Sequence, residues 1–203
     1  IAAKVRQRGC ALGQTGAQRD RRHGASGFDQ QQAEFVRLTT PSVNAVAAAV
    51  GVTGDFFERA QEVVAAGADV ICIDVAHGHH VLMEIALKKL RDIFGDSVHI
   101  MAGNVATLEG FNDLADWGAD SVRCNIGGGS ICSTRIQTGH GIPGLQTILD
   151  CAQTDRDVKI VADGGIRNSG DMVKAIAAGA DVGYKSGRSR LRRDSVDSNT
   201  PAS

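Results

Sequence analysis

The chain has 203 residues, enough for one domain with a hydrophobic core, and 42% of them are hydrophobic while 22% are charged. Its formal net charge of −1 excludes a strongly basic or acidic surface, so we expect neither nucleic acid nor a membrane as a partner. Only one Trp and one Tyr accompany 25 Gly residues, a composition that suits many tight turns.

Cysteine usage and hydropathy predict a cytoplasmic protein. The five cysteines form no Cys-x-x-Cys pair, so we expect neither a disulfide framework nor a cysteine zinc site; they are Cys10, Cys72, Cys124, Cys132 and Cys151. No apolar run approaches the roughly 20 residues that span a bilayer, and the N-terminus has no signal-peptide core. A reducing compartment is therefore expected.

Three segments follow one another along the chain. Residues 1–45 mix Arg, Gln and Gly without a sustained period of 2 or 3.6, which predicts a poorly defined N-terminal segment. Residues 46–187 carry a regular alternation of elements and form the expected core. Residues 188–203 are polar and rich in Ser, so we expect a mobile tail.

Short apolar runs alternate with helical patterns in this core. The strands are predicted at Val46–Val52, Val70–Val75, Val98–Ala102, Ser121–Asn125, Val158–Ala162 and Asp181–Tyr184. The helices are predicted at Asp55–Ala66, Val81–Phe94, Leu108–Trp117, Leu145–Gln153 and Ser169–Ala178. Strands that alternate with helices of about 10–15 residues predict right-handed βαβ units and a parallel sheet.

A repeated tripeptide supports this α/β interpretation. Gly-Ala-Asp closes a predicted helix and opens a strand at Gly67–Asp69, Gly118–Asp120 and Gly179–Asp181. Gly suits the left-handed position that follows a helix C-terminus. The alternation alone leaves a closed barrel and an open sheet as alternatives, because a barrel of this type needs eight strands and six are visible.

Polar residues and glycines gather where the predicted strands end. In parallel α/β folds, ligands bind beyond the carboxyl ends of the strands. These positions hold Asp74, Asn104, the segment 127–135 and the turn Asp163-Gly164-Gly165. Ordinary turn chemistry explains any one of them but explains the whole set poorly.

The loop Ile126–Pro143, IGGGSICSTRIQTGHGIP, carries the strongest local signal. Its consecutive glycines let the backbone approach a ligand, and their N–H and C=O groups can bind an anion or a cation. Ser130 and Thr134 add hydroxyl groups. Cys132 should be more accessible than the cysteines in predicted strands, although position alone leaves a nucleophile and a buried small side chain about equally favoured.

The motifs GGGSICSTR, TGHGIP and VADGGIRNSGD resemble the catalytic loop and phosphate-binding turn of the IMP dehydrogenase/GMP reductase family. The segments CIDVAHGHH and HIMAGNVAT are similar to two further strand ends of that family. The resemblance runs roughly from Val46 to Asp181. It implies a parallel (β/α)₈ TIM barrel with about six recognisable βα units, and a homo-oligomer, commonly a tetramer, that binds a purine nucleotide such as IMP or XMP.

The resemblance also implies a covalent mechanism. Cys132 would attack C2 of IMP, hydride would pass to NAD, and water, handled with the help of Thr134, would release XMP. The substrate would be held by Ser130, Gly164 and Gly165 near the phosphate and by Asp163 at the ribose hydroxyls. Asp74 and Asn104 would lie near the nicotinamide ribose and the reacting base. A potassium ion would bind the carbonyl groups of Gly127, Gly129 and Cys132.

Within the family, the turn that contains Ile166 favours the dehydrogenase, because reductases usually place a cysteine there. We therefore expect NAD-dependent oxidation of IMP to XMP, a step of GMP biosynthesis. A GMP reductase, which uses the same cysteine in the reductive direction, is the alternative within the family. A catalytically silent barrel fragment that binds nucleotide is the alternative from another class.

Other positions depart from the family pattern. The first two barrel strands are not recognisable before Val46, the segment 185–187 replaces a Gly-Ser or Gly-Gly phosphate turn, and no Arg-Tyr flap pair follows. These departures predict an incomplete or rearranged member. Near the loop, Gly128 stands where proline is common, Gly144 where glutamine is common, and Cys124-Asn125 where a small apolar residue and Gly are usual. We expect the last of these to distort the strand end that aims Cys132.

The histidine cluster HGHH gives a weaker signal. His77, His79 and His80 could suggest a metal site, but the usual further His or carboxylate at helical spacing is missing. The cluster also belongs to the family resemblance, where it ends a strand without binding metal, so we expect no zinc there.

Overall fold

The computed structural model describes residues 45–129 and 132–184. Within them, six parallel strands form one sheet in which each strand pairs with the next along the sequence. The strands are β1 (Ala47–Val50), β2 (Val70–Asp74), β3 (His99–Val105), β4 (Ser121–Cys124), β5 (Lys159–Asp163) and β6 (Val182–Tyr184). The helices are α2 (Phe56–Ala65), α3 (Val81–Phe94), α4 (Leu108–Asp116), α5 (Thr134–Thr138), α6 (Gly144–Cys151) and α7 (Ser169–Ala177).

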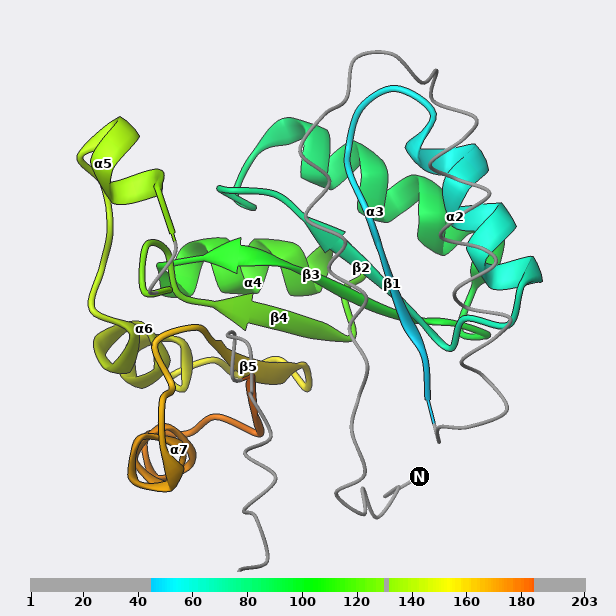
Figure 1. Cartoon of the computed structure of the whole chain (residues 1–203). Helices are drawn as coiled ribbons and strands as arrows, with labels where there is room; N and C mark the ends of the chain where they lie inside the picture. Colours follow the sequence, from blue (N-terminus) through cyan, green and yellow to red (C-terminus); the bar gives the residue numbers. More distant parts are fainter. Residues whose placement is uncertain (1–44, 130–131, 185–203) are drawn as a thin grey trace, which may run out of the picture.

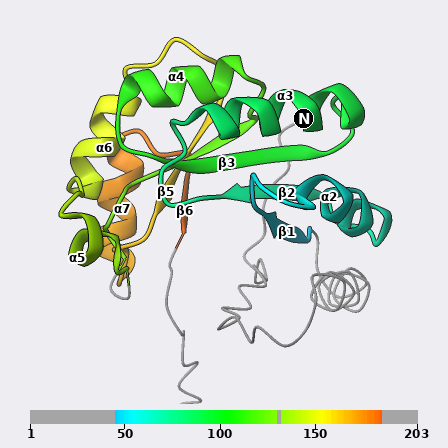
Figure 2. The ribbon, with the colours of Figure 1, turned by 90° about the horizontal axis from the view of Figure 1, so that it is seen from above.

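The sheet is curved, and α2, α3, α4, α6 and α7 lie around its outer side (Figures 1 and 2). A helix stands between each pair of successive strands, so every connection is a βαβ crossover. Sequential pairing, curvature and an outer layer of helices are the features of a TIM barrel. The predicted α/β fold, with six recognisable barrel strands, is confirmed.

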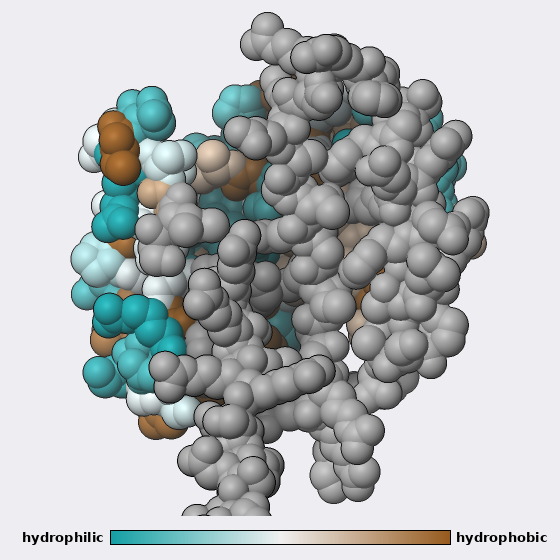
Figure 3. Space-filling model, viewed as in Figure 1, coloured by the Kyte–Doolittle hydropathy of each residue, from teal (hydrophilic) through white to brown (hydrophobic). Residues whose placement is uncertain are grey.

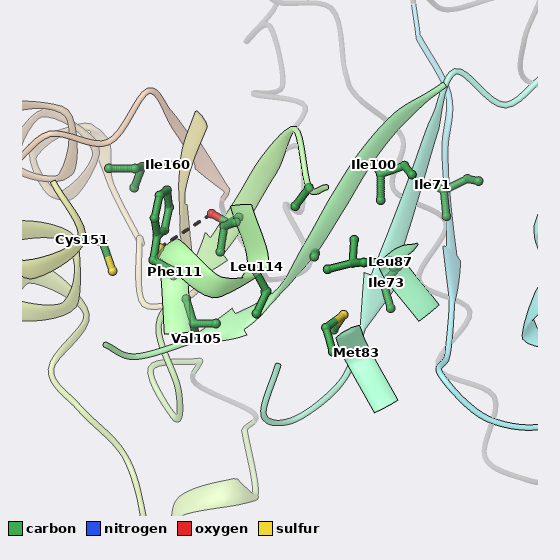
Figure 4. Close-up of a cluster of buried hydrophobic side chains, with 14 of the residues drawn as sticks. Ile71, Ile73, Met83, Leu87, Ile100, Val105, Phe111, Leu114, Cys151 and Ile160 are labelled. Atoms are coloured by element: carbon green, nitrogen blue, oxygen red, sulfur yellow. Dashed lines mark hydrogen bonds between the residues drawn. The ribbon is translucent and has the colours of Figure 1, made fainter. Parts of the chain in front are cut away.

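The hydrophobic core lies between the sheet and the helices. In α3, the spacing of Met83, Leu87 and Leu90 places them on one helix face, and all three are buried against the sheet. Ile71 and Ile73 of β2 belong to the same cluster. Fully burying side chains of this size stabilises the fold by about 1.5–3 kcal/mol each. Figure 4 shows the same layer continuing through Ile100, Val105, Phe111, Leu114, Cys151 and Ile160.

The Gly-Ala-Asp repeats form three equivalent joints at the amino-terminal ends of the strands. The glycines have the positive φ angles expected after a helix, with values of +104°, +108° and +113° at Gly67, Gly118 and Gly179. The alanine of each repeat is buried beneath the joint. The prediction of a left-handed glycine at each position is therefore confirmed.

The aspartate of each joint is tied twice to the preceding strand. Its backbone N–H donates to the carbonyl of a residue at or near the start of that strand, and its carboxylate accepts from the N–H of the same residue. The pairs are Asp69 with Val46, Asp120 with Ile100, and Asp181 with Ile160; the backbone bonds are 2.9 Å each and the carboxylate bonds 2.8, 2.7 and 2.9 Å. These reciprocal bonds set the register of β1 with β2, β3 with β4, and β5 with β6.

Two predictions of local structure need correction. β3 continues to Val105, beyond the predicted end at Ala102, because its backbone still pairs with β4 up to Cys124. Asn104 therefore lies inside a strand instead of after its end. The loop after β4 contains the short helix α5, which its glycine-rich sequence did not predict. Ser130, the segment 185–187 and the expected N-terminal segment and tail, apart from residue 45, lie outside the described residues.

Among the described helices, none combines the length and the apolar character that a bilayer crossing requires. On the face shown in Figure 3, hydrophilic residues separate the apolar ones over the segment from α5 to α7. The exposed apolar side chains of this segment are Ile136, Leu145, Leu149, Val173 and Ile176.

Candidate active site

A buried arginine joins two carboxylates at the ends of different strands. Arg123 of β4 is only 8% exposed, and its Nη1 and Nη2 atoms lie 2.8 Å from Asp74 Oδ1 and Asp163 Oδ2. Asp74 ends β2 and Asp163 ends β5, so the sheet brings together side chains that are far apart in the sequence. Arg123 also contacts the Sγ atom of Cys72, and burial raises the pKa of that thiol to about 11. Cys72 is therefore no candidate nucleophile.

Two asparagines hold Asp163 in place. The Nδ2 group of Asn104 donates to Asp163 Oδ2 at 2.7 Å and to the carbonyl of Asn125 at 2.8 Å. The Nδ2 group of Asn125 donates to the backbone carbonyl of Asp163 at 2.7 Å. Arg123 and Asn104 both bind the same carboxylate oxygen, Oδ2, so the other oxygen of Asp163 faces no donor from either of them.

Cys132 differs from the other described cysteines. It is partly exposed, whereas Cys72, Cys124 and Cys151 are buried, which confirms the predicted difference in accessibility. The hydroxyl of Thr134 hydrogen-bonds the Cys132 sulfur and lowers the pKa of the thiol. The backbone N–H of Thr134, the charge of Arg135 and the backbone of Gly127 lower this pKa further. Because the thiolate is the nucleophile, the loop increases the reactive fraction of Cys132 at neutral pH.

Thr134→Val should raise the pKa of Cys132, because valine keeps the shape of the side chain but cannot donate a hydrogen bond to the thiolate. A raised pKa leaves less thiolate at neutral pH, so alkylation by iodoacetamide should become slower there and should recover at high pH. The measurement is the rate of Cys132 alkylation against pH, resolved by peptide mass spectrometry. Ser133→Val serves as the control, because Ser133 is exposed and its side chain makes no capping bond. Equal midpoints in both variants would contradict the role of Thr134.

Two cavities occupy the carboxyl end of the sheet. The larger, of about 330 Å³, is bounded by six of the predicted site residues: Asp74, Asn104, Gly127, Cys132, Thr134 and Asp163. Its volume is at the lower end of the range of about 300–1,000 Å³ for ligand pockets. The smaller, of about 200 Å³, is lined by Gly164, Gly165 and Lys174, among others. Asn125 and Asp163 line both cavities. The structure thus brings the predicted nucleophile and the predicted ribose-binding carboxylate to one cavity.

The predicted cation site can be tested against the loop backbone. Gly127 is buried with φ +84°, and the Cys132 N–H lies 3.1 Å from the Gly129 carbonyl, so the loop folds back on itself around these residues. Neutral carbonyl groups suit a cation of low charge, whereas divalent cations take carboxylates. The carbonyl groups of Gly127, Gly129 and Cys132 are therefore of the kind that would hold a potassium ion. In the histidine segment, where no zinc site is expected, the Nε2 atom of His79 lies 2.7 Å from Asp113 Oδ2. This hydrogen bond joins the segment to α4.

Comparison with known proteins gives the family of the chain. The model of the IMP dehydrogenase / GMP reductase domain matches residues 35–184 of the chain. The chain belongs to this family. The family is one of oxidoreductases, and its match extends upstream of Val46, where the recognisable motifs begin.

Relatives of both names are similar to the chain. An inosine-5'-monophosphate dehydrogenase of Nitrosopumilus maritimus is 47% identical over 137 residues, which are 66% of this chain and 29% of the relative. A GMP reductase of Leishmania major is 48% identical over 140 residues, 68% of this chain and 28% of the relative. The chain thus spans less than a third of the length of these curated relatives.

Solved structures of the family share the fold. The inosine 5' monophosphate dehydrogenase of Legionella pneumophila gives a TM-score of 0.68 at 47% identity, covering 76% of this chain and 47% of that one. GMP reductase C318A of Trypanosoma brucei, in complex with guanosine 5'-monophosphate, gives a TM-score of 0.67 at 46% identity, covering 70% and 30% of the two chains. These family members are TIM barrels, and the six-stranded parallel sheet of this chain agrees with that fold.

Sequence reasoning missed two residues that shape the site. Arg123 was treated as part of an apolar strand, and Asn125 as a departure from the family pattern. The signal for Arg123 was a lone charged residue between Val122 and Cys124, in a strand whose neighbour β5 ends in a carboxylate, as does the next-but-one strand β2. No local signal reveals the side-chain contacts of Asn125, because its amide bonds to the turn after β5, which is distant in the sequence.

Proposed function

We propose that this chain carries the Cys132 site of a purine-nucleotide oxidoreductase and that the reaction is the NAD-dependent oxidation of IMP to XMP. The observation that carries the proposal is the single cavity shared by Cys132, whose thiol pKa is lowered, and the strand-end carboxylates of Asp74 and Asp163. A reactive thiolate can attack the base of a nucleotide, and carboxylates beside it can accept from the ribose hydroxyls.

The Cys132 thiolate forms the covalent bond of the reaction. Its sulfur adds to C2 of the purine, and the hydride of the C2–H bond leaves. NAD, when bound, would supply the acceptor for this hydride. Water then adds at C2, the C–S bond breaks, and XMP and the free thiol are released; overall, IMP, NAD⁺ and water give XMP, NADH and a proton. The Thr134 hydroxyl, which hydrogen-bonds the Cys132 sulfur, lies next to the bond that water cleaves and orients that water.

The neighbouring residues bind the remainder of the ligands. Asp163 accepts from the ribose hydroxyls through Oδ1, since Oδ2 is bound by Arg123 and Asn104. Gly164 and Gly165, with φ of +75° and +73°, turn the backbone beside the smaller cavity and hold the phosphate there. The family resemblance assigns Ser130 to the same phosphate. The partly exposed carboxylate of Asp74 accepts from the nicotinamide ribose. The carbonyl groups of Gly127, Gly129 and Cys132 would hold potassium, whose charge would draw the three carbonyl groups together and so fix the shape of the loop.

GMP reductase is the second candidate. It is favoured by relatives of that name with the same level of identity as the dehydrogenases. Ile166 favours the dehydrogenase, because a cysteine is usual there in reductases; in the structure Ile166 is buried and lines the smaller cavity.

One experiment separates the candidates. Reduced, purified protein is mixed with IMP, NAD and potassium chloride in one arm, and with GMP and NADPH in the other, while cofactor absorbance and the nucleotide products are followed. XMP formed together with NADH supports the dehydrogenase, and IMP formed only in the second arm supports the reductase. Nucleotide binding by calorimetry without turnover in either arm would leave a catalytically silent binding domain and reject both activities.

A further inference from the structure

Asn125 has a backbone conformation that is unusual for its residue type. Its φ angle is +123°, and it is the sole non-glycine residue with a positive φ among residues 45–129 and 132–184. L-residues other than glycine rarely adopt such values. The side chain is not a solvent-exposed turn amide either, since Asn125 is only 5% exposed. A strained and buried position is retained only where its surroundings hold it in place.

The contacts of Asn125 connect the ends of three strands. Its backbone N–H donates to Val105 of β3, and its carbonyl accepts from Asn104. Its Nδ2 group donates to the carbonyl of Asp163 at 2.7 Å and reaches that of Gly164 at 3.4 Å. The carbonyl groups of Asp163 and Gly164 are acceptors, so the NH₂ group of the Asn125 amide must face them. Its Oδ1 atom therefore points away from this turn, and the described residues offer it no hydrogen-bond partner there.

Two glycines surround the Asn125 amide. A Cβ atom at Gly128 would lie 1.9 Å from Asn125 Nδ2, and one at Gly144 would lie 2.9 Å from it. Neither glycine has a φ in the left-handed region, so the backbone conformation does not demand glycine at either position. What excludes a side chain there is the space that the amide occupies. The three departures from the family pattern at 125, 128 and 144 are therefore one packing arrangement.

This arrangement lies between the nucleophile loop and the phosphate-side turn. Gly128 belongs to the loop that carries Cys132, and Gly144 begins α6. The amide between them is bonded to the turn after β5. Gly129, next to Gly128, accepts the backbone N–H of Cys132 at 3.1 Å, so a shift of this loop reaches the nucleophile directly.

We propose that Asn125 is a positioning residue for Cys132: its amide acts as a spacer that fixes the Cys132 loop on the Asp163–Gly165 turn, and Gly128 and Gly144 lack side chains because this spacer fills their space. The proposal rests on the proposed function only in taking Cys132 as the reacting group. It is tested without any purine nucleotide, so absence of turnover would leave the test intact.

A double-mutant cycle tests the shared space. Gly128→Ala should lower the melting temperature by about 4 °C or more in the presence of Asn125, because the new methyl group displaces the amide. In the Asn125→Gly background, the same change should cost less than about 1 °C. Gly51→Ala is the matched control, since a Cβ atom there meets nothing within 4 Å. Gly144→Ala, whose overlap is milder, replaces Gly128→Ala if that variant does not fold.

The rate of Cys132 alkylation tests positioning as distinct from stability. At a high pH, where the thiol is ionised in every variant, Asn125→Gly and Gly128→Ala should both change the rate of Cys132 alkylation by iodoacetamide, whereas Gly51→Ala should leave it unchanged. The double variant should show no larger change than Asn125→Gly alone. Additive losses of melting temperature would overturn the shared space, and an unchanged rate in both single variants would overturn the positioning role.

Discussion

Cys132→Ala is expected to lower the rate of product formation by at least about 10³-fold while purine-nucleotide binding is retained. The physical reason is that the covalent step has no alternative nucleophile, because the remaining described cysteines are buried. The methyl group of alanine fits the partly exposed position without strain, so the loss should not come from unfolding. The measurement is turnover with IMP and NAD, beside calorimetric binding of IMP and the melting temperature.

Ser133→Ala provides the matched control for this variant. Ser133 is the adjacent residue, is exposed, and makes no side-chain capping bond to α5. Its turnover should stay within about twofold of the wild type, as expected for a surface substitution worth under 0.5 kcal/mol. If the wild type is active and Cys132→Ala keeps more than a tenth of its activity, Cys132 is not the nucleophile and the proposed mechanism fails.

Arg123→Met is expected to destabilise the protein by about 3–5 kcal/mol. Methionine fills the volume of the arginine stem but leaves the carboxylates of Asp74 and Asp163 without their cation, and the Asp163 side chain is only 11% exposed. A loss of this size corresponds to a fall in melting temperature of about 10 °C for a chain of this length. Thermal unfolding, followed by circular dichroism, measures it.

Arg156→Met is the control, because Arg156 also bridges two carboxylates, those of Asp116 and Asp155, but on the surface. Exposed pairs of this kind contribute about 0–1 kcal/mol, so its melting temperature should hardly change. Adding Asp74→Asn and Asp163→Asn to Arg123→Met should restore part of the loss, since the unpaired charges are then removed. Equal effects of Arg123→Met and Arg156→Met would show that the buried ion pairs do not stabilise the fold.

The elements of the fold were predictable because their signals are local. The helix Val81–Phe94 was predicted with its observed bounds, because its apolar spacing lies within the segment. The residues that cap it are its direct neighbours: Gly95 follows it, and His80, whose ring accepts from the backbone N–H of Leu82, precedes it. The Gly-Ala-Asp joints were recognisable for the same reason. Each consists of three consecutive residues whose backbone requirements do not depend on distant parts of the chain.

The arrangement within the site was less predictable because its partners come from different strands. Sequence placed Cys132, Asp163 and Asp74 at strand ends, and the structure brings all three to one cavity. The ion pairs of Arg123 and the packing of Asn125 depend on which strands are neighbours and on their register. A substitution at 125 can be judged tolerable or distorting only when the space at Gly128 and Gly144 is known. The roles of Ser130, NAD and potassium stay predictions.

The three Gly-Ala-Asp joints also divide the sheet into pairs of strands. They connect β1 with β2, β3 with β4, and β5 with β6, so among the described strands they recur at every second one. Each pair is held by an aspartate carboxylate that accepts a backbone N–H across the pair, in addition to the pairing of the strands themselves. The sheet is therefore fastened two strands at a time at its amino-terminal edge.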